Sequence, residues 1–278
     1  MSGTLFIVGT PLGHLGDLSA RAADTLRAVS VVVAEDTRRS RPLVRSLGAK
    51  ARLLSFHAHS PPARLEQIVE RLLAGDDVAL VTDAGMPTIS DPGATLIAAA
   101  RRAGCDVRVV PGPSAVSAAL AVSGFPADRY RFLGFLPRKG PERAVLLEEA
   151  GSSQVTIVLF EAANRLVPLL ADLARAAGAE RQVAVTRELT KLHEEVRVGT
   201  LTEIAEYYQV HEPRGEVTVV LAGAGSRAAP ATADAAAARA HAERLLADGA
   251  TRRDVARTLM ETFGLTRNDA YRLVTSLD

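Results

Sequence analysis

The sequence predicts an α/β protein with two α/β domains and a small helical C-terminal extension. Up to about residue 124, short runs of β-branched and other apolar residues alternate with amphipathic helical patterns. This alternation is typical of a parallel sheet that helices cover on both faces. A second alternation follows, and the last part of the chain carries helical patterns alone. We therefore expect three units, at residues 1–124, 125–225 and 226–278.

Five strands are expected in the first unit, because five runs are apolar on consecutive residues and are bounded by turn residues. Such runs are typical of strands buried on both faces. The runs are residues 5–8, 29–34, 53–56, 78–81 and 107–110. Between them, apolar residues at 65–73 recur with helical spacing and end at Gly75, and a second helix is expected from Pro92 to about Gly104.

The second unit and the tail follow from the same signals. Strands are expected at residues 131–136, 155–160, 183–185, 195–198 and 217–221. Helices are expected at residues 142–150, 164–177 and about 201–208, and in the tail at 241–247, 252–263 and 267–277. The segment 222–233, rich in Ala, Gly, Ser and Pro, is typical of a linker.

Composition excludes several classes of protein. The chain has 278 residues, of which 47% are hydrophobic and 23% are charged, so extensive disorder is excluded. The single cysteine, Cys105, cannot form an internal disulfide bond and fits a reducing setting. No apolar run is long enough to span a membrane, and the N-terminus lacks the features of a signal peptide. We therefore expect a cytoplasmic protein without a membrane partner.

A glycine-containing loop follows the first expected strand. Gly9, Gly13 and Gly16 have the spacing G-x-x-x-G-x-x-G, whereas a dinucleotide-binding loop needs G-x-G-x-x-G. Pro11 also removes a backbone N–H that could bind phosphate. The GxxxxGK[ST] loop of nucleoside triphosphatases is absent as well. The loop therefore disfavours nicotinamide and triphosphate ligands, but it suits a sharp turn that lines another ligand.

Two further loops follow expected strands and are rich in glycine and proline. DAGMPTISDPG (83–93) follows the fourth strand, and PGPSA (111–115) follows the fifth. Ligands of open α/β sheets bind outside the carboxyl ends of the strands. There the Asp83 carboxylate can accept hydrogen bonds from a ribose or an amino group, and Asp91 can cap the next helix. The loops together predict a ligand site at this edge of the sheet.

The net charge of +1, from 33 basic and 32 acidic residues, conceals two basic runs. Residues 37–65 contain seven Arg and Lys and no acid, and residues 129–143 contain five basic residues and one glutamate. A solvated helix face would explain either run alone, but two runs beside the expected ligand loops favour a phosphate track. The candidate residues of this track, for a nucleic-acid partner, are Arg38, Arg39, Arg41, Arg45, Arg138 and Lys139.

Seven motifs in order carry a resemblance to a known family. They are GTPLGHLGDLS (9–19), AEDTRRS (34–40), DAGMPTISDPG (83–93), PGPSA (111–115), FLGFLPRKG (132–140), RELTKLHEE (187–195) and GEVTVVLAG (215–223). With them the chain resembles the bacterial ribosomal RNA small subunit methyltransferase I family, cytidine 2′-O-methyltransferases of the tetrapyrrole-methylase superfamily. The resemblance covers about residues 4–223 and leaves out the helical tail.

The resemblance implies two α/β domains of the tetrapyrrole-methylase (class III methyltransferase) type, with S-adenosylmethionine in the cleft between them. It also implies a homodimer and a substrate in the decoding region of 16S rRNA, within the small ribosomal subunit. The implied cofactor-binding residues are Pro11, Leu12, Asp83, Gly85, Met86, Ser114, Ala115, Phe160, Arg187 and Ala222. We expect charge reversal at Arg39 and Arg41 to weaken RNA binding while cofactor affinity stays intact.

Methyl transfer to a ribose hydroxyl needs aligned reacting atoms and help in removing the hydroxyl proton. Acids and a lysine in two motifs are candidates for this help, and the favoured catalytic residues are Asp36, Glu188 and Lys191. For Asp36 the alternative is a structural role, as a helix cap or a partner of Arg38. Glu188 and Lys191 would share a face only in a helix, and their segment resembles a strand or loop.

No metal site is expected, because His57 and His59 lack a nearby Cys or carboxylate with ligand spacing.

Two other functions stay open on the sequence alone. One is a tetrapyrrole C-methyltransferase, whose porphyrinoid substrate would need a few cations rather than a long basic track. The other is a ligand-sensing regulator whose tail binds DNA through Arg267, Asn268 and Arg272. The tail has the rhythm of a helix–turn–helix, but its eight arginines are balanced by seven acids. Packing or dimer contact is therefore as good an explanation of the tail as RNA docking.

Overall fold

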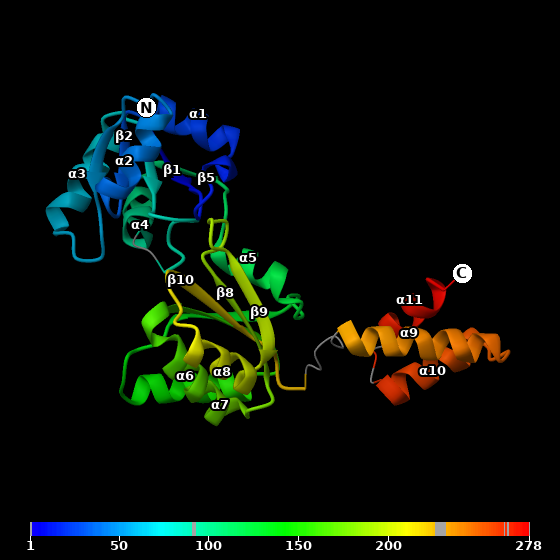
Figure 1. Cartoon of the computed structure of the whole chain (residues 1–278). Coiled ribbons are helices and arrows are strands. Elements are labelled where there is room, and N and C mark those ends of the chain that lie inside the picture. The colour runs from blue at the N-terminus through cyan, green and yellow to red at the C-terminus, as the bar shows by residue number, and fades with distance from the viewer. Residues whose placement is uncertain (1, 91–92, 226–231, 264, 266, 278) are drawn as a thin grey trace.

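The computed structural model describes residues 2–90, 93–225, 232–263, 265 and 267–277. These residues form two five-stranded sheets and a group of C-terminal helices (Figure 1), which confirms the predicted α/β class. The predicted cap at Asp91 and helix start at Pro92 lie outside the described residues. The side chains of Arg267 and Asn268 lie outside them as well.

The first sheet is parallel, with its strands in the order β3-β2-β4-β1-β5. The strands are β1 (Thr4–Val8), β2 (Val31–Ala34), β3 (Arg52–Ser55), β4 (Val78–Val81) and β5 (Asp106–Val110). The inner strands β2 and β4 are buried at every residue, as their uninterrupted apolar runs predict. Burial on both faces was a wrong prediction for β5, which lies at the sheet edge and leaves Val109 56% exposed.

Helices cover both faces of the first sheet, as predicted for a doubly wound domain. They are α1 (Ala20–Ala28), α2 (Thr37–Ser46), α3 (Pro62–Leu73) and α4 (Ala94–Arg102), with the 3-10 helix η1 (Leu15–Asp17) before α1. Leu26 of α1 and Val44 of α2 belong to one core cluster, whereas Ile68 of α3 and Leu96 of α4 belong to the other. Because the strands are parallel, their carboxyl ends all open at the same edge.

The second sheet is mixed, in the order β6-β7-β10-β8-β9. Its strands are β6 (Tyr130–Phe135), β7 (Thr156–Ala162), β8 (Gln182–Arg187), β9 (Glu195–Thr200) and β10 (Glu216–Leu221). β6 and β7 pair in parallel. β10, the last of these strands in the sequence, lies between β7 and β8 and is antiparallel to both. The beginning of β10 therefore lies beside the end of β7.

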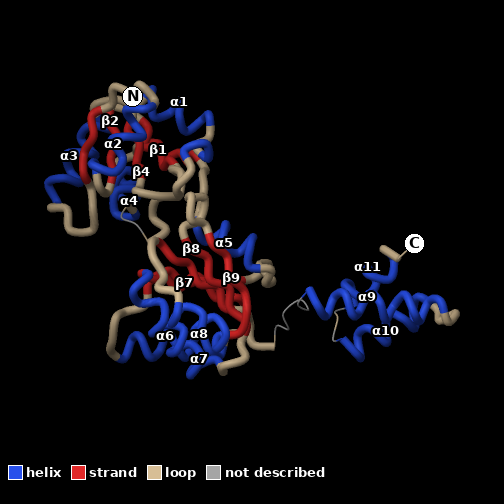
Figure 2. The backbone as a smooth tube through the Cα atoms, viewed as in Figure 1, coloured by secondary structure: helices blue, strands red, loops and turns tan. Residues whose placement is uncertain are grey.

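The second sheet is also covered on both faces. One face carries α6 (Pro141–Ser152), α7 (Leu166–Ala177) and α8 (Leu201–Val210), with the 3-10 helix η2 (Ala163–Arg165) before α7. The other face carries α5 (Ala115–Ser123), whose Val116 and Leu120 cluster with Val158 and Val220. α5 therefore packs on the second sheet although it precedes residue 124. The chain passes from one sheet to the other in the loop before α5 (Figure 2).

The tail consists of α9 (Thr232–Ala247), α10 (Arg252–Phe263) and α11 (Arg267–Thr275). These helices share a core of their own, which includes Ala242, Leu259 and Val274. The linker predicted at 222–233 is too long at both ends, since Ala222 is buried against the sheet and α9 begins at Thr232. Alanine favours helices, so an Ala-rich stretch does not distinguish a linker from a helix. In the described part of the chain, no helix is long and apolar enough to cross a membrane.

Candidate functional site

A cavity of about 450 Å³ lies between the two sheets. The first sheet lines it with the loops after β1, β2, β4 and β5, and the second sheet with the ends of β6 and β7 and the beginning of β10. Among the implied cofactor-binding residues, those that line the cavity are Leu12, Asp83, Gly85, Met86, Ser114, Ala115 and Phe160. The cavity thus occupies the place at the carboxyl strand ends where the sequence predicts a ligand site.

The second sheet contributes more of the lining than the sequence predicted. The additional lining residues are Phe135, Glu161, Ala162, Ala163, Gly215, Glu216, Val217 and Thr218. Several of them belong to the motifs at 132–140 and 215–223, so a signal was present in the sequence. The sequence carried no signal for the pairing of β10 with β7. This antiparallel pairing, with Glu216 opposite Ala162, brings the beginning of β10 beside the end of β7.

The first glycine loop is tied to neighbouring loops rather than shaped around a phosphate. Thr10 and Gly85 exchange two backbone hydrogen bonds, with N–O distances of 2.9 and 3.1 Å. Gly9 and Gly112 bring the loops after β1 and β5 into backbone contact, because a Cβ on Gly9 would lie 2.6 Å from the Gly112 Cα. These glycines therefore serve the close packing of three loops, consistent with the missing phosphate-binding spacing.

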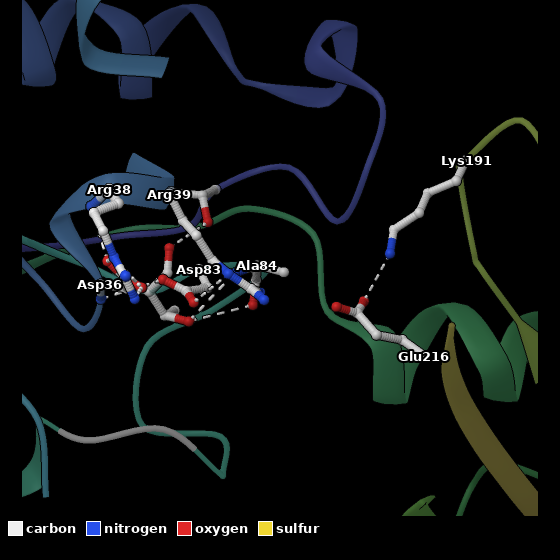
Figure 3. Close-up of polar contacts among 9 residues, drawn as sticks. Asp36, Arg38, Arg39, Asp83, Ala84, Lys191 and Glu216 are labelled. Atoms are coloured by element: carbon white, nitrogen blue, oxygen red, sulfur yellow. Dashed lines mark hydrogen bonds and ion pairs between the residues drawn. The ribbon is translucent and has the colours of Figure 1, made fainter. Parts of the chain in front are cut away.

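Asp83 lies in a polar cluster at the end of β4 (Figure 3). Its Oδ1 accepts a hydrogen bond from the Asp36 N–H at 3.3 Å, and its Oδ2 lies 3.4 Å from the Arg39 Nε. Burial raises the pKa of Asp83 above its ordinary value, while the Asp36 N–H and the Arg39 guanidinium oppose this rise. The Asp83 side chain is 22% exposed, so a ligand in the cavity can reach it.

Asp36 caps the N-terminus of α2 and is not among the described residues that line the cavity. Its carboxylate accepts the Arg38 N–H at 2.9 Å and pairs with the Arg38 guanidinium at 2.7 Å. The hydrogen bonds from Arg38 lower the pKa of Asp36 from 3.8 to about 2. These contacts correspond to the structural alternative, a helix cap and a partner of Arg38. A catalytic role for Asp36 stays a prediction that its position does not support.

The lowered pKa of Asp36 predicts a dependence of stability on pH. The folded state favours the carboxylate, so its contribution is fully present above the unfolded pKa and is lost as pH falls from about 4 toward 2. We expect the unfolding free energy of Asp36→Asn to fall less steeply over this range than that of the wild type, in urea unfolding followed by circular dichroism. Asp24→Asn, which removes an exposed pair with Arg27, is the control. Equal slopes for Asp36→Asn and the wild type would contradict the prediction.

The turn between β8 and β9 brings Glu188 and Lys191 together without being helical. The Lys191 Nζ lies 3.0 Å from the Glu188 Oε1 and 3.1 Å from the Glu216 Oε2. Burial would lower the pKa of Lys191, but these two carboxylates outweigh it and raise the pKa, so Lys191 is a cation at neutral pH. Burial would raise the pKa of Glu188, but the Glu216 N–H and Lys191 lower it. Neither Glu188 nor Lys191 is among the described residues that line the cavity. Both contact Glu216, which does line it.

The same turn contacts the first glycine loop, so the two sheets meet beside the cavity. The His14 N–H donates a hydrogen bond to the Thr190 Oγ1 at 3.1 Å. Gly13 makes room for the Lys191 side chain, because a Cβ on Gly13 would lie 2.2 Å from the Lys191 Cγ. The position of Lys191 therefore depends on a glycine from the other sheet's loop.

Backbone strain is concentrated in two loops near the cavity. In the described residues, the non-glycine residues with positive φ are Thr88 (74°), Ser90 (67°), Glu188 (52°) and Thr190 (65°). The first two follow β4 and the last two follow β8. Such backbone costs about 1–3 kcal/mol per residue and persists only where the surroundings enforce it, commonly at functional sites.

Three implied cofactor-binding residues are not among the described residues that line the cavity. Pro11 is buried next to Leu12. The Arg187 Nε is engaged by the Glu195 Oε2 at 2.9 Å. Ala222 directly follows β10 and lies four residues beyond Thr218, the last described lining residue of that strand, which is roughly 13 Å in extended chain. A cofactor contact for these three residues therefore stays a prediction without support from their placement.

Glu161 lies beneath the cavity surface, and its side chain is 0% exposed. Its Oε1 accepts the Ala162 N–H at 2.8 Å, and its Oε2 lies 3.2 Å from the Arg165 Nη2. A ligand in the cavity cannot reach a carboxylate without exposed surface. We conclude that Glu161 orders the segment between β7 and α7 rather than acting on a ligand.

The candidate RNA-binding residues separate into two groups. All six are exposed, and five of them, on α2 and on the loop after β6, are not among the described residues that line the cavity; these are Arg38, Arg41, Arg45, Arg138 and Lys139. Arg39 differs, because it lines the cavity and pairs with Asp83. We therefore revise the expectation that charge reversal at Arg39 leaves cofactor affinity intact. The second basic run is partly engaged in internal pairs, Arg131 with Glu149 and Arg143 with Asp172.

Among the described residues, no group of three or more His, Cys, Asp or Glu is arranged to hold a metal ion. The rings of His57 and His59 lie 6.5 Å apart, between centroids.

Comparison with known proteins agrees with this fold. Residues 4–205 match the family model of tetrapyrrole (corrin/porphyrin) methylases. The solved structure of uroporphyrin-III C-methyltransferase from Thermus thermophilus superposes with a TM-score of 0.56, at 23% identity, over 78% of this chain and 94% of that chain. The solved structure of cobalt precorrin-4 methyltransferase superposes with a TM-score of 0.61, at 20% identity, over 79% of this chain and 94% of that chain. The class is therefore that of the tetrapyrrole methylases.

Curated relatives are more similar in sequence, and three of them share the name ribosomal RNA small subunit methyltransferase I. The relative from Synechocystis is 40% identical over 276 residues, 99% of this chain and 99% of that protein. The relative from Micromonospora olivasterospora is 43% identical over 98% of this chain and 87% of that protein. The relative from Thermotoga maritima is 45% identical over 80% of this chain and 99% of that protein. The chain belongs to the ribosomal RNA small subunit methyltransferase I family of tetrapyrrole methylases.

Methyltransferases of this family use S-adenosylmethionine, and the residues of the cavity fit it. A volume of about 450 Å³ is within the range of small-ligand sites. Leu12, Met86 and Phe160 provide apolar walls for an adenine ring, and the partly exposed Asp83 can accept hydrogen bonds from hydroxyl or ammonium groups. The cofactor has no phosphate, in keeping with a glycine loop that packs on its neighbours. When bound, it supplies an activated methyl group.

Proposed function

We propose that this chain methylates the ribose 2′-oxygen of a cytidine in 16S rRNA, in the decoding region of the small ribosomal subunit, with S-adenosylmethionine as methyl donor. The observation that carries this proposal is the 40–45% identity to relatives named ribosomal RNA small subunit methyltransferase I, over 87–99% of their length. The exposed arginines of α2, which follow β2 at the edge where the cavity lies, suit the backbone of an RNA substrate.

The residues of the cavity have distinct roles in this proposal. Asp83 binds the cofactor, and the apolar side chains around it exclude water from the methyl group. Arg39 and Glu216 line the cavity with exposed side chains, 67% and 63% respectively, where the acceptor nucleotide enters. Alignment of the two substrates supplies much of the rate of such a displacement.

The decisive experiment incubates the protein with methyl-labelled cofactor and small ribosomal subunits from a strain that lacks the enzyme. Label on a cytidine 2′-oxygen of 16S rRNA would support the proposal, and label on no RNA would refute it. Naked 16S rRNA, assayed in parallel, shows whether the assembled subunit is required. Label on a carbon of added uroporphyrinogen III would instead favour a tetrapyrrole C-methyltransferase, for which the similar solved structures support the fold alone.

RNA and cofactor binding are expected to respond differently to two neighbouring arginines. Arg41→Glu should weaken RNA binding, and should reduce the slope of log affinity against log salt by about one, because about one phosphate contact is lost. Its cofactor affinity should stay at the wild-type value, whereas Arg39→Glu should lose affinity for both ligands because Arg39 pairs with Asp83. Filter binding over a salt series and calorimetry measure the two affinities. Arg27→Glu on α1 is the control, and reduced cofactor affinity in Arg41→Glu would contradict the prediction.

Removal of residues 228–278 is expected to leave cofactor affinity within about twofold of the wild type. The described tail helices bury a core of their own, and 221 residues of this chain match 99% of the Thermotoga maritima relative. That relative is thus shorter by a segment about as long as the tail. Equilibrium binding of the cofactor to the shortened chain tests the expectation, and loss of binding would contradict it. A DNA-binding regulator would instead lose its affinity for DNA.

We also propose a cytoplasmic homodimer, with the division of the chain into 1–124, 125–225 and 226–278, in which α5 of the first segment packs on the sheet of the second. Family resemblance supports the dimer. Light scattering tests it, since a dimer has twice the 29.3 kDa of one chain, and a monomeric mass would refute it.

A further inference from the structure

Among the described acids that line the cavity, Glu216 is the most exposed. Its side chain is 63% exposed, compared with 22% for Asp83 and 0% for Glu161, and Glu35 is of intermediate exposure. Figure 3 shows Glu216 with Lys191, separate from the cluster around Asp83. The second sheet thus presents an accessible carboxylate to the cavity.

Glu216 is fixed at both its backbone and its side chain. Its N–H donates to the Glu188 Oε1 at 3.0 Å, and its Oε2 accepts from the Lys191 Nζ at 3.1 Å. The Lys191 Nζ is itself held by Glu188 at 3.0 Å, and the Lys191 side chain passes over Gly13. An exposed glutamate at a strand end would ordinarily sample several rotamers, whereas this one is tethered by a cation.

The two accessible carboxylates differ in what they can contact. Asp83 lies deeper and is engaged by the Asp36 N–H and Arg39, so it suits a cofactor that fills the cavity. Glu216 lies at the surface, where an acceptor that arrives on a large RNA must approach. Lys191 engages one carboxylate oxygen, the Oε2, and a carboxylate offers about four acceptor positions.

We propose that Glu216 is a catalytic residue on the acceptor side, which binds the ribose hydroxyl and takes its proton, and that Lys191 is the positioning residue that holds it there. This inference rests on the proposed function. As the hydroxyl oxygen forms its bond to the methyl carbon, the O–H bond breaks and the proton passes to Glu216. The methyl–sulfur bond breaks with its electron pair left on sulfur, and Glu216 then releases the proton to water.

The test measures single-turnover rates on small ribosomal subunits at saturating cofactor, as a function of pH. Glu216→Gln keeps the shape of the side chain but cannot accept a proton, and should lower the rate about 100-fold or more, the usual contribution of a general base. Its cofactor affinity, measured by equilibrium dialysis, should stay within about twofold of the wild type. Glu212→Gln, an exposed glutamate outside the described lining, is the matched control and should keep the wild-type rate.

Lys191→Met provides a readout that a purely structural role would not change. The charged groups that face Glu216 are Lys191 and Glu188 of the turn, and Asp83, whose pKa Glu216 helps to raise. Without the cation the Glu216 side chain loses its tether, so Lys191→Met should lower the single-turnover rate while cofactor affinity stays within about twofold of the wild type, and it should add nothing in the Glu216→Gln background. Gly13→Ala should have the same effect, because its Cβ would displace Lys191, and the double variant should add nothing further.

Three results would overturn the inference: a wild-type rate in Glu216→Gln, a loss confined to its cofactor affinity, or a wild-type rate in Lys191→Met. In each case RNA methylation by the wild type would leave the proposed function standing. Failure of the wild type to methylate any RNA would instead reject the proposed function, and this inference with it.

Discussion

Replacing Gly9 with alanine is expected to destabilise the protein by about 2–3 kcal/mol and to abolish cofactor binding. The added Cβ would lie 2.6 Å from the Gly112 Cα and 2.7 Å from the Met86 Sδ. Met86 can rotate, but the Gly112 backbone cannot, so the loops after β1 and β5 must separate. Because both loops lead into the cavity, its walls move with them. Urea unfolding measures the loss of stability, and calorimetry with the cofactor measures the loss of binding.

Gly104→Ala is the control for this variant. Gly104 has a φ of 77°, and its added Cβ would meet nothing within 4 Å in the described part of the chain. Alanine there costs roughly 1–2 kcal/mol of backbone strain without touching the cavity. We expect it to lose stability while cofactor affinity is unchanged. If Gly9→Ala bound cofactor as the wild type does, close packing of these loops would not be what shapes the cavity.

Replacing Asp83 with asparagine is expected to weaken cofactor binding about 10- to 100-fold, or ~1.4–2.8 kcal/mol, as for loss of a charged hydrogen-bond partner. The amide keeps the size of the side chain and an oxygen for the Asp36 N–H. It carries no charge for Arg39 or for the ammonium group of the cofactor. Equilibrium dialysis against labelled cofactor measures the change.

Asp106→Asn is the matched control for Asp83→Asn. Asp106 is also paired with an arginine, Arg108, at 2.9 Å, but it is 66% exposed and begins β5 at the end away from the cavity. Cofactor affinity should be unchanged in this variant. Unchanged affinity in Asp83→Asn as well would remove Asp83 from the cofactor site.

Uninterrupted apolar runs made the strands of the first sheet predictable, because β2 and β4 are buried on both faces. α1 was not predicted, and its buried residues explain why. Two of the three are alanines, Ala22 and Ala23, beside Leu26, so the buried face carries one large apolar residue and no recurring run of them. In the second sheet the strands were predictable but their order was not. Pairing depends on which edges meet in three dimensions, and the sequence of a strand does not encode its neighbour.

The site was predictable where a residue follows its own strand and unpredictable where it depends on a partner. Asp83 could be placed because a polar residue after a buried strand lies at the ligand edge. The approach of Glu188 to Lys191 could not be predicted from the sequence. It requires a positive φ at Glu188, which residues other than glycine rarely adopt. The position of Glu216 was missed because its backbone depends on the pairing of β10 with β7. Its side chain depends on Lys191, which depends in turn on Gly13.

The central place of β10 in the second sheet has a consequence for folding during synthesis. β6 to β9 leave the ribosome before residues 216–221, and until then β7 and β8 each lack the strand that lies between them. The nascent chain therefore carries two unpaired strand edges, a state prone to wrong pairing. Residues 215–218 also complete the cavity wall. Ligand binding thus becomes available only after the second sheet closes, so a chain truncated before residue 216 should neither bind cofactor nor escape quality control.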